Sequence, residues 1–236
     1  MAETDWTEMS DGLSAPVVDR GVTAGVTVPP STISNSFVFG FHSLAAAEGA
    51  VAYHTNQANF SPMVKGGRIV AAVKRAVSAA PLGWSPFLFL GAQGTSVNDG
   101  AYLLGLEDAD PYRIVLRKAG TIQGGIPLAD ETNSLRRSSE QFSVVDDAWH
   151  HLRLDMVVND NGDVVLNVFS NDLDVNGIGD TPDWQAIQGM SQFIDDALGI
   201  NSGSQPHISG YGGFGTRVEE ITRRAYFDHV EVERQL

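Results

Sequence analysis

The sequence of 236 residues contains no cysteine, so neither disulfide bonds nor thiolate metal ligands contribute to its structure. Basic residues are also scarce, because 15 lysines and arginines stand against 29 aspartates and glutamates, for a net charge of -14. This balance argues against nucleic acid as a partner, since a broad phosphate-neutralising surface needs clustered basic side chains. Cationic ligands, divalent metal ions and basic protein partners remain compatible with the charge.

Long apolar runs are missing as well. The longest apolar stretches are far shorter than the roughly 20 residues that span a bilayer, so we expect no membrane-spanning segment. Residues 1–14 carry acidic side chains and no basic residue ahead of an apolar run, so we expect no signal peptide of the Sec type. The sequence therefore predicts a soluble protein.

What the chain does contain is a series of short segments with strand character, separated by Gly, Asn, Asp, Pro or Ser. Eleven segments fit this description: residues 36–42, 49–54, 67–77, 86–91, 101–107, 112–118, 141–144, 149–158, 163–169, 209–214 and 224–233. Eleven strands exceed what one open sheet usually holds. We therefore predict an all-β fold in which two antiparallel sheets pack as a β-sandwich.

The chain is expected to divide near residue 34. Residues 1–34 are predicted to form an N-terminal edge strand or an arm laid on a neighbouring subunit, and Pro29-Pro30 prevents regular central-strand pairing within them. Residues 35–236 are predicted to form one sandwich domain, because no internal repeat or low-complexity tract divides them. A single β-sandwich of this length is common.

Apolar and polar residues alternate most clearly in residues 149–156, where Arg153 and Asp155 fall on the face opposite to the apolar side chains. The Asn-Gly pair at 161–162 predicts a turn, so residues 149–169 are the best-defined hairpin in the chain.

Two further segments give periodicity predictions. Strict alternation at the C terminus would place Tyr226, Asp228, Val230 and Val232 on one strand face and Phe227, His229, Glu231 and Glu233 on the other. One short helix is expected at residues 190–198, where Met190, Phe193, Ile194, Ala197 and Leu198 fall at helical spacing and Gly199 supplies a stop.

These segments carry a resemblance to a known fold family. The run Ala148-Trp149-His150-His151-Leu152-Arg153-Leu154-Asp155, with a polar turn and then Val164–Phe169, resembles the paired back strands of laminin-G-like and concanavalin-A-like jelly rolls. Residues 225–232 look like the last strand of the same fold. The resemblance implies a concanavalin-A-like jelly roll.

A larger part of the chain, from Asn35–Ser43 through Phe60–Met63 and Arg223–Asp228 to the C terminus, is similar to virion structural proteins of tailed bacteriophages. This resemblance implies a particle component of the tail, baseplate, fibre or head surface, made in the host cytoplasm. Its partners would be other virion proteins and further copies of itself in a homo-oligomer. The shared motifs are structural, so the resemblance implies assembly and not catalysis.

The acidic stretch at residues 172–183 is the sharpest chemical signal. Oxygen-bearing side chains fall at loop positions one, three, five, nine and twelve around a glycine at six, which resembles an EF-hand calcium loop. The predicted calcium ligands are Asp172, Asp174, Asn176, Asp180 and Asp183. Position twelve lacks the usual bidentate glutamate, and Pro182 excludes a flanking helix pair, so a solvated acidic loop is the alternative interpretation.

A glycan-binding site needs an aromatic platform beside polar side chains. Trp84, Tyr102, Trp184 and Tyr211 lie near predicted loops and are the candidates. The alternative for each is a place in the core, where most aromatic residues of strand-rich folds lie. A carbohydrate-recognising receptor-binding module with a calcium-organised loop, whose partner is a cell-surface glycan, is therefore the alternative to pure assembly.

Signals for catalysis are weak, and we expect no enzyme. Glu231 and Glu233, or Glu219 and Glu220, could supply paired carboxylates, and same-face neighbours on a strand lie about 7 Å apart, a spacing compatible with glycoside hydrolysis. A charged outer face is the favoured interpretation of these residues. None of the six histidines forms a His-x-His pair, and no nucleophile elbow or phosphate-binding loop appears. A glycoside hydrolase or lyase is the third hypothesis.

Overall fold

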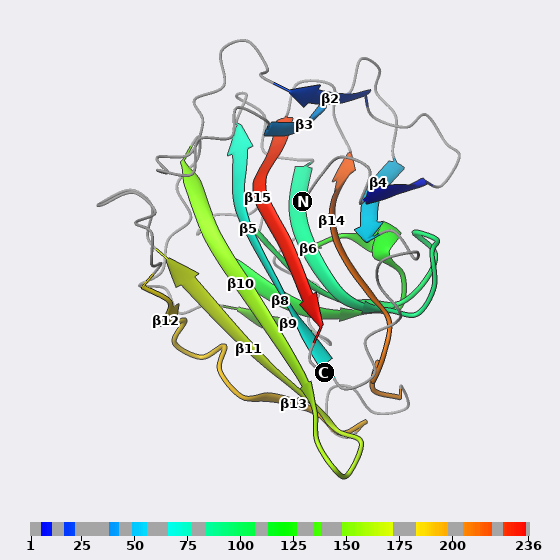
Figure 1. The fold of residues 1–236 in the computed structure, drawn as a ribbon, viewed down its shortest axis with the longest axis vertical. Helices are drawn as coiled ribbons and strands as arrows, with labels where there is room; N and C mark the ends of the chain where they lie inside the picture. The colour runs from blue at the N-terminus through cyan, green and yellow to red at the C-terminus, as the bar shows by residue number, and fades with distance from the viewer. Residues whose placement is uncertain are drawn as a thin grey trace.

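The structure is a computed structural model that describes residues 6–10, 17–21, 38–42, 49–55, 66–76, 84–106, 113–126, 135–137, 148–171, 183–197, 205–218 and 224–234. Two layers of antiparallel strands make up this part of the chain (Figure 1). The predicted strand at residues 141–144 lies outside the described residues. No helix in the described segments is long and apolar enough to cross a bilayer.

The first layer is a seven-stranded sheet. Its strands run in the order β1 (Trp6–Ser10), β4 (Gly49–Thr55), β14 (Tyr211–Val218), β6 (Trp84–Ala92), β7 (Ala101–Leu106), β8 (Ile114–Ala119) and β9 (Leu135–Arg137). A 3-10 turn, η2 (Ile122–Gly124), follows β8.

The second layer is an eight-stranded sheet. Its order is β12 (Gln185–Ala186), β11 (Val164–Asn171), β10 (Trp149–Val158), β5 (Gly66–Ala76), β15 (Arg224–Arg234), β3 (Val38–His42) and β2 (Val17–Gly21), and β13 (Phe193–Asp195) also pairs with β11. The strands β1 and β2 each lie at the edge of a sheet. The division of the chain at residue 34 stays a prediction.

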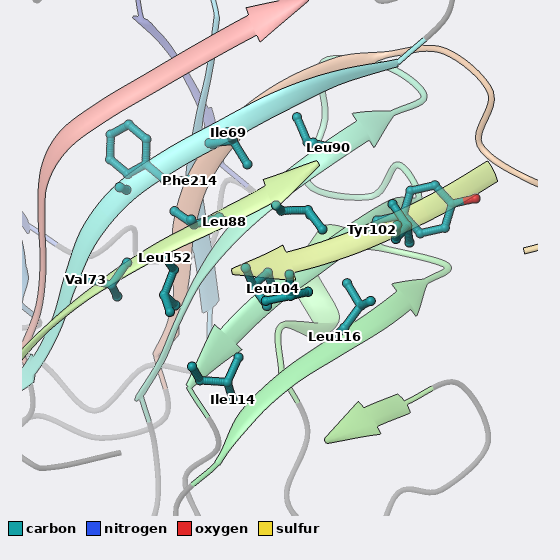
Figure 2. Packing of buried hydrophobic residues seen from close by; sticks show 14 of the residues in the cluster. Ile69, Val73, Leu88, Leu90, Tyr102, Leu104, Ile114, Leu116, Leu152 and Phe214 are labelled. Atoms are coloured by element: carbon teal, nitrogen blue, oxygen red, sulfur yellow. The ribbon is translucent and has the colours of Figure 1, made fainter. Parts of the chain in front are cut away.

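The main core lies between the two sheets and follows the period of two along each strand. Ile69, Val73 and Leu152 project from the eight-stranded sheet toward Leu88 and Leu104 of the other sheet (Figure 2). The predicted burial of Leu152, Leu154 and Met156 is confirmed. A second apolar cluster, which includes Phe87, Phe89, Leu103, Val115, Ile122 and Ile126, forms from alternate positions of the seven-stranded sheet and the segment around η2.

The hairpin predicted at residues 149–169 is confirmed. Val158 pairs with Val164, and β10 and β11 stay in register along their lengths. The turn is stabilised by the Asn159 side chain, whose Oδ1 accepts hydrogen bonds from the backbone N–H groups of Asn161 (3.0 Å) and Asp163 (2.9 Å). Gly162 takes a φ of 85°, which a glycine adopts without strain.

The strict alternation predicted for residues 226–233 is wrong, because a β-bulge interrupts β15. The register against β5 shifts between Asp228 and Glu231, and His229 takes a φ of 50°. One extra residue exchanges the two faces beyond that point. The core-facing residues are therefore Ala225, Phe227, Val230 and Val232, while Tyr226, Asp228, Glu231 and Glu233 share the other face.

The helix predicted at residues 190–198 is also wrong over its described part. Phe193 and Asp195 of β13 are buried while Ile194 is 52% exposed, which is the alternation of a strand. Positive φ values at Gln192 (55°) and Ala197 (64°) interrupt any helix. The free edge of β11 offers backbone partners to this segment, and that pairing overrides the apolar spacing.

A buried ion pair ties the two sheets together. The Nζ atom of Lys118, on β8, lies 2.6 Å from Oδ2 of Asp195, on β13, and both side chains are almost fully buried. The hydroxyl of Tyr102 donates a 2.6 Å hydrogen bond to the same oxygen and accepts one from the backbone N–H of His207 at 2.9 Å. Burial, helped by Asp195, raises the pKa of Tyr102 well above its ordinary value, so the phenol stays a donor.

Asp195→Asn should destabilise the fold strongly, since it leaves the Lys118 ammonium buried without its counter-charge. Breaking one half of a buried pair costs about 3–5 kcal/mol. Chemical denaturation should show this loss in the free energy of unfolding, whereas Asp160→Asn, in the exposed β10–β11 turn, should change it by less than about 0.5 kcal/mol. Equal losses in the free energy of unfolding from the two substitutions would contradict a stabilising role of the buried Lys118–Asp195 pair.

Candidate functional site

Polar and aromatic side chains gather on the outer face of the eight-stranded sheet, which we define as the side of β11, β10, β5 and β15 turned away from the core. These four strands lie side by side (Figure 1). Residues paired across antiparallel strands project to the same side, so the outer face is built of rows that cross the strands. Three rows carry the candidate site.

The first row is an ion-pair network around Asp155. Arg68 donates from Nε to Oδ1 of Asp155 at 2.8 Å and from Nη2 to Oδ2 at 3.3 Å. Arg153, on the same strand as Asp155, donates hydrogen bonds from Nε and Nη2 to both oxygens of this carboxylate. Burial alone would raise the pKa of Asp155, but the hydrogen bonds from Arg153 and Arg68 outweigh it and lower that pKa. Asp155 therefore stays ionised and holds both guanidinium groups in place.

The second row is an aromatic and cationic stack. The guanidinium of Arg153 lies 4.4 Å from the ring centre of Phe169 and 5.8 Å from that of Trp184, within the range of cation–π attraction. Trp184 directly precedes β12 and is half-buried. Its ring also packs on the ring of His151, with the centroids 4.5 Å apart. Trp184 is thus held from two sides and keeps part of its surface exposed.

The third row is His151–Ala72–Asp228. His151 of β10 and Asp228 of β15 both pair with Ala72 of β5, one from each side. His151 is 4% exposed and Asp228 is 5% exposed. Within the described part of the chain, Nδ1 of His151 and Oδ2 of Asp228 are buried and have no hydrogen-bond partner.

Burial sets the protonation of this third row. It lowers the pKa of His151 to about 4, and the nearby His229 acts in the same direction, so His151 is neutral at pH 7. Burial raises the pKa of Asp228, and His229 only partly offsets that effect. Both groups are therefore held in an environment that penalises their charged forms.

Exposure falls from one end of the outer face to the other. The side chain of Arg68 is 40% exposed and that of its partner Glu233, with Nη1 and Oε2 3.5 Å apart, is 64% exposed. Beyond the His151 row, Trp149, Lys74 and Tyr226 pair in register and are all buried. Trp184 and Arg153 lie between these two ends, where a ligand can reach the half-buried side chains.

The structure does not bring the four glycan candidates together. Trp184 lies on the outer face of the eight-stranded sheet, whereas the half-buried Tyr211 packs on His54 of the seven-stranded sheet, with ring centroids 5.5 Å apart. Tyr102 is fully buried in the main core, so it offers no ring face to a sugar. Trp84 is the first residue of β6.

Most of the predicted calcium loop lies outside the described residues. This applies to Asp172, Asp174, Asn176 and Asp180, while Asp183 is exposed and adjoins Trp184. The described residues contain no group of three or more metal-ligating His, Asp or Glu side chains. Calcium binding at residues 172–183 therefore stays a prediction.

Of the two glutamate pairs considered for catalysis, the structure describes one. Glu231 and Glu233 lie on the exposed part of the outer face, where Glu233 pairs with Arg68. Glu219 and Glu220 lie outside the described residues. The sequence reasoning missed Asp228, which lies on the outer face together with His151. The adjacent histidines at 150 and 151 were the one feature of the sequence that could have indicated this part of the outer face.

No protein-family model and no curated protein matches the sequence. Solved structures do match. The legume lectin-like domain from Entamoeba histolytica is similar over 99% of this chain and 91% of that chain, with a TM-score of 0.50 and 8% identity. The fold is lectin-like and concanavalin-A-like.

Two further solved structures are similar to this chain. The marine PL-14 alginate lyase from Aplysia kurodai matches over 92% of this chain and 87% of that chain, with a TM-score of 0.50 and 11% identity. The carbohydrate recognition domain of Emp47p matches over 100% of both chains, with a TM-score of 0.49 and 11% identity. At these identities a likeness concerns the fold alone. The two antiparallel sheets, together with the two structures that match with a TM-score of 0.50, confirm the predicted two-sheet jelly roll.

His151→Gln should reduce the pH dependence of the free energy of unfolding. The pKa of His151 is lowered in the folded state, so the unfolded chain takes up the proton more readily and stability falls as pH drops from 6.5 toward 4. The wild type should lose about 2 kcal/mol between pH 7 and pH 5 through this one group. Denaturation at both pH values should show a loss smaller by that amount in the variant.

Asn161→Gln, in the exposed β10–β11 turn, is the control and should leave the pH dependence close to that of the wild type, because neither side chain titrates. If His151→Gln and the wild type lose the same stability between the two pH values, His151 is not the buried neutral group that its surroundings indicate.

Proposed function

We propose that this lectin-like chain is a non-catalytic carbohydrate-binding module whose ligand packs on Trp184. The observation that carries the proposal is the half-buried Trp184 ring, braced by His151 and Arg153 beside polar side chains of the outer face. A sugar ring packs its apolar face on an aromatic ring while neighbouring polar groups bond to its hydroxyls. Trp184 and its surroundings supply both elements.

Rigidity of the ring strengthens the proposal. The Asp155 network fixes Arg153, and Arg153 in turn lies over Phe169 and Trp184. Binding to an aromatic side chain that is already ordered avoids much of the entropy cost of immobilising it. Two similar structures are named for a lectin and for an alginate lyase, and both names refer to carbohydrates, which supports a saccharide ligand.

Assembly into a virion is the second candidate function, predicted from the resemblance to tailed-phage proteins. One observation favours a protein contact: Val157 (37% exposed) and Ile194 (52% exposed) both pair with Val165, so three apolar residues form a row at one end of the outer face. Exposed apolar residues that adjoin one another mark interaction sites. Virion partners, homo-oligomerisation and a place in a particle remain proposals for this row.

Trp184→Ala should abolish binding on a glycan array, because it removes the aromatic surface on which the sugar packs. Tyr211→Ala is the matched control, since it removes a half-buried aromatic ring from the other sheet. The control should bind like the wild type. If the wild type binds no saccharide, or if Trp184→Ala binds as well as the wild type, the carbohydrate proposal fails and the assembly function is favoured.

Bound calcium would affect the position of Trp184 through the backbone, because the predicted ligand Asp183 directly precedes Trp184. We propose that calcium at residues 172–183 orders the approach to β12 and thereby the Trp184 ring. A chelator should then reduce glycan binding by the wild type at least about tenfold, and added calcium should restore it. Binding that is unchanged by the chelator would contradict a calcium-organised loop.

A further inference from the structure

The outer face contains a pair of polar groups that the packing of the fold does not explain. His151 and Asp228 pair with Ala72 from its two sides, so their side chains project to one face on either side of the Ala72 methyl group. Two strand spacings of about 4.8 Å each separate their Cα atoms. Ala72 is itself fully buried, so a ligand group can lie between the imidazole and the carboxylate only where neighbouring side chains move aside.

Both side chains are buried and incompletely bonded. They are 4% and 5% exposed, yet Nδ1 of His151 and Oδ2 of Asp228 have no hydrogen-bond partner among the described residues. Buried polar atoms in native proteins are almost always bonded, because leaving one unpaired costs its full desolvation. The other carboxylate oxygen of Asp228 accepts the backbone N–H of His229 at 2.7 Å, which fixes the carboxylate and leaves Oδ2 free.

The backbone at Asp228 supplies a second, independent observation. The β-bulge in β15 begins at this residue, and His229 within it takes a φ of 50°, a conformation that a bulky residue rarely adopts. Bulges of this kind redirect side chains and concentrate next to binding and active sites. A strand without the bulge could not hold Asp228 on the outer face and also return Val230 and Val232 to the core.

The chemistry of the two unpaired atoms indicates which functional groups a ligand would present to them. A carboxylate oxygen accepts hydrogen bonds, and an imidazole nitrogen accepts or donates one according to its tautomer. A hydroxyl group can both donate and accept, so hydroxyls satisfy both atoms. A ligand carboxylate would instead place one anionic oxygen against another at Asp228. The ring of His151 also contacts Trp184, which joins these polar atoms to the aromatic surface.

We propose that His151 and Asp228 form a polar subsite that binds hydroxyl groups of a neutral saccharide packed on Trp184. The proposal rests on the carbohydrate-binding function proposed above and names the part of the outer face that selects the ligand. Sugar hydroxyls would supply the hydrogen bonds that the fold leaves unmade. In the absence of sugar, the unpaired groups lower the stability of the fold.

The test uses two variants that change the polar atoms of the pair and keep the approximate shape of each side chain. His151→Phe keeps a ring against Trp184 and removes both ring nitrogens. Asp228→Asn keeps an oxygen for the His229 N–H, removes the charge and replaces the acceptor Oδ2 with an amide nitrogen. Glu231→Gln is the matched control, because it removes an exposed carboxylate from the same face of the same strand. Affinity for the strongest neutral glycan on the array and the melting temperature without ligand are measured for all three.

His151→Phe and Asp228→Asn should each weaken binding about 10- to 100-fold, the effect of losing one hydrogen bond to a buried or charged group. Their melting temperatures without ligand should stay equal to that of the wild type or rise by a few degrees. His151→Phe removes the unpaired nitrogen, and Asp228→Asn replaces a buried carboxylate with an uncharged amide that costs less to bury. Glu231→Gln should change neither quantity. A purely structural pair would show the opposite, with a lower melting temperature in both variants.

The outcomes separate the subsite from the function on which it rests. A wild type that binds no glycan overturns the carbohydrate function and the subsite together. Glycan binding that depends on Trp184 but is within twofold of the wild type in both variants overturns the subsite alone. In that case an ordered water is the occupant. A fall of several degrees in melting temperature likewise overturns the subsite.

Discussion

The antiparallel pairing of β5 with β10 on one side and with β15 on the other is the constraint on which the rest of the structure depends. It sends Ile69, Ala71 and Val73 into the core and turns the alternate residues outward. The same register places Arg68 beside Asp155 and sets His151 and Asp228 on either side of Ala72. A slip of one residue would exchange both faces, so the core and the candidate site are specified together.

One local exception to this alternation creates the polar row. The bulge at His229 lets β15 place Asp228 outward and then return Val230 to the core two residues later. The cost is a positive φ at a histidine and a buried carboxylate oxygen without a bond. The Lys118–Asp195–Tyr102 cluster, by contrast, is buried with bonded charges and ties the sheets. Bonded buried groups stabilise the fold, whereas unbonded ones mark a place where a ligand completes the bonding.

The sequence predicts the parts of this fold that local patterns encode. The β10–β11 hairpin follows from clear alternation and an Asn-Gly turn, and both were visible in the chain. The helix predicted at 190–198 failed because apolar residues at helical spacing also fit a short strand, and the unpaired edge of β11 decided between them. The bulge left no mark in the order of residues. The His151–Asp228 pair depends on the register of three strands, which no local pattern contains.

Chemical-shift mapping of the labelled protein with a neutral oligosaccharide tests the central claim most directly, since it locates the ligand without any substitution. The largest changes should fall on the Trp184 indole, the His151 imidazole and the backbone around Asp228, all on the outer face of the eight-stranded sheet. Changes centred on Tyr211 and His54 of the other sheet, or no changes at saturating sugar, would contradict a carbohydrate site on the outer face.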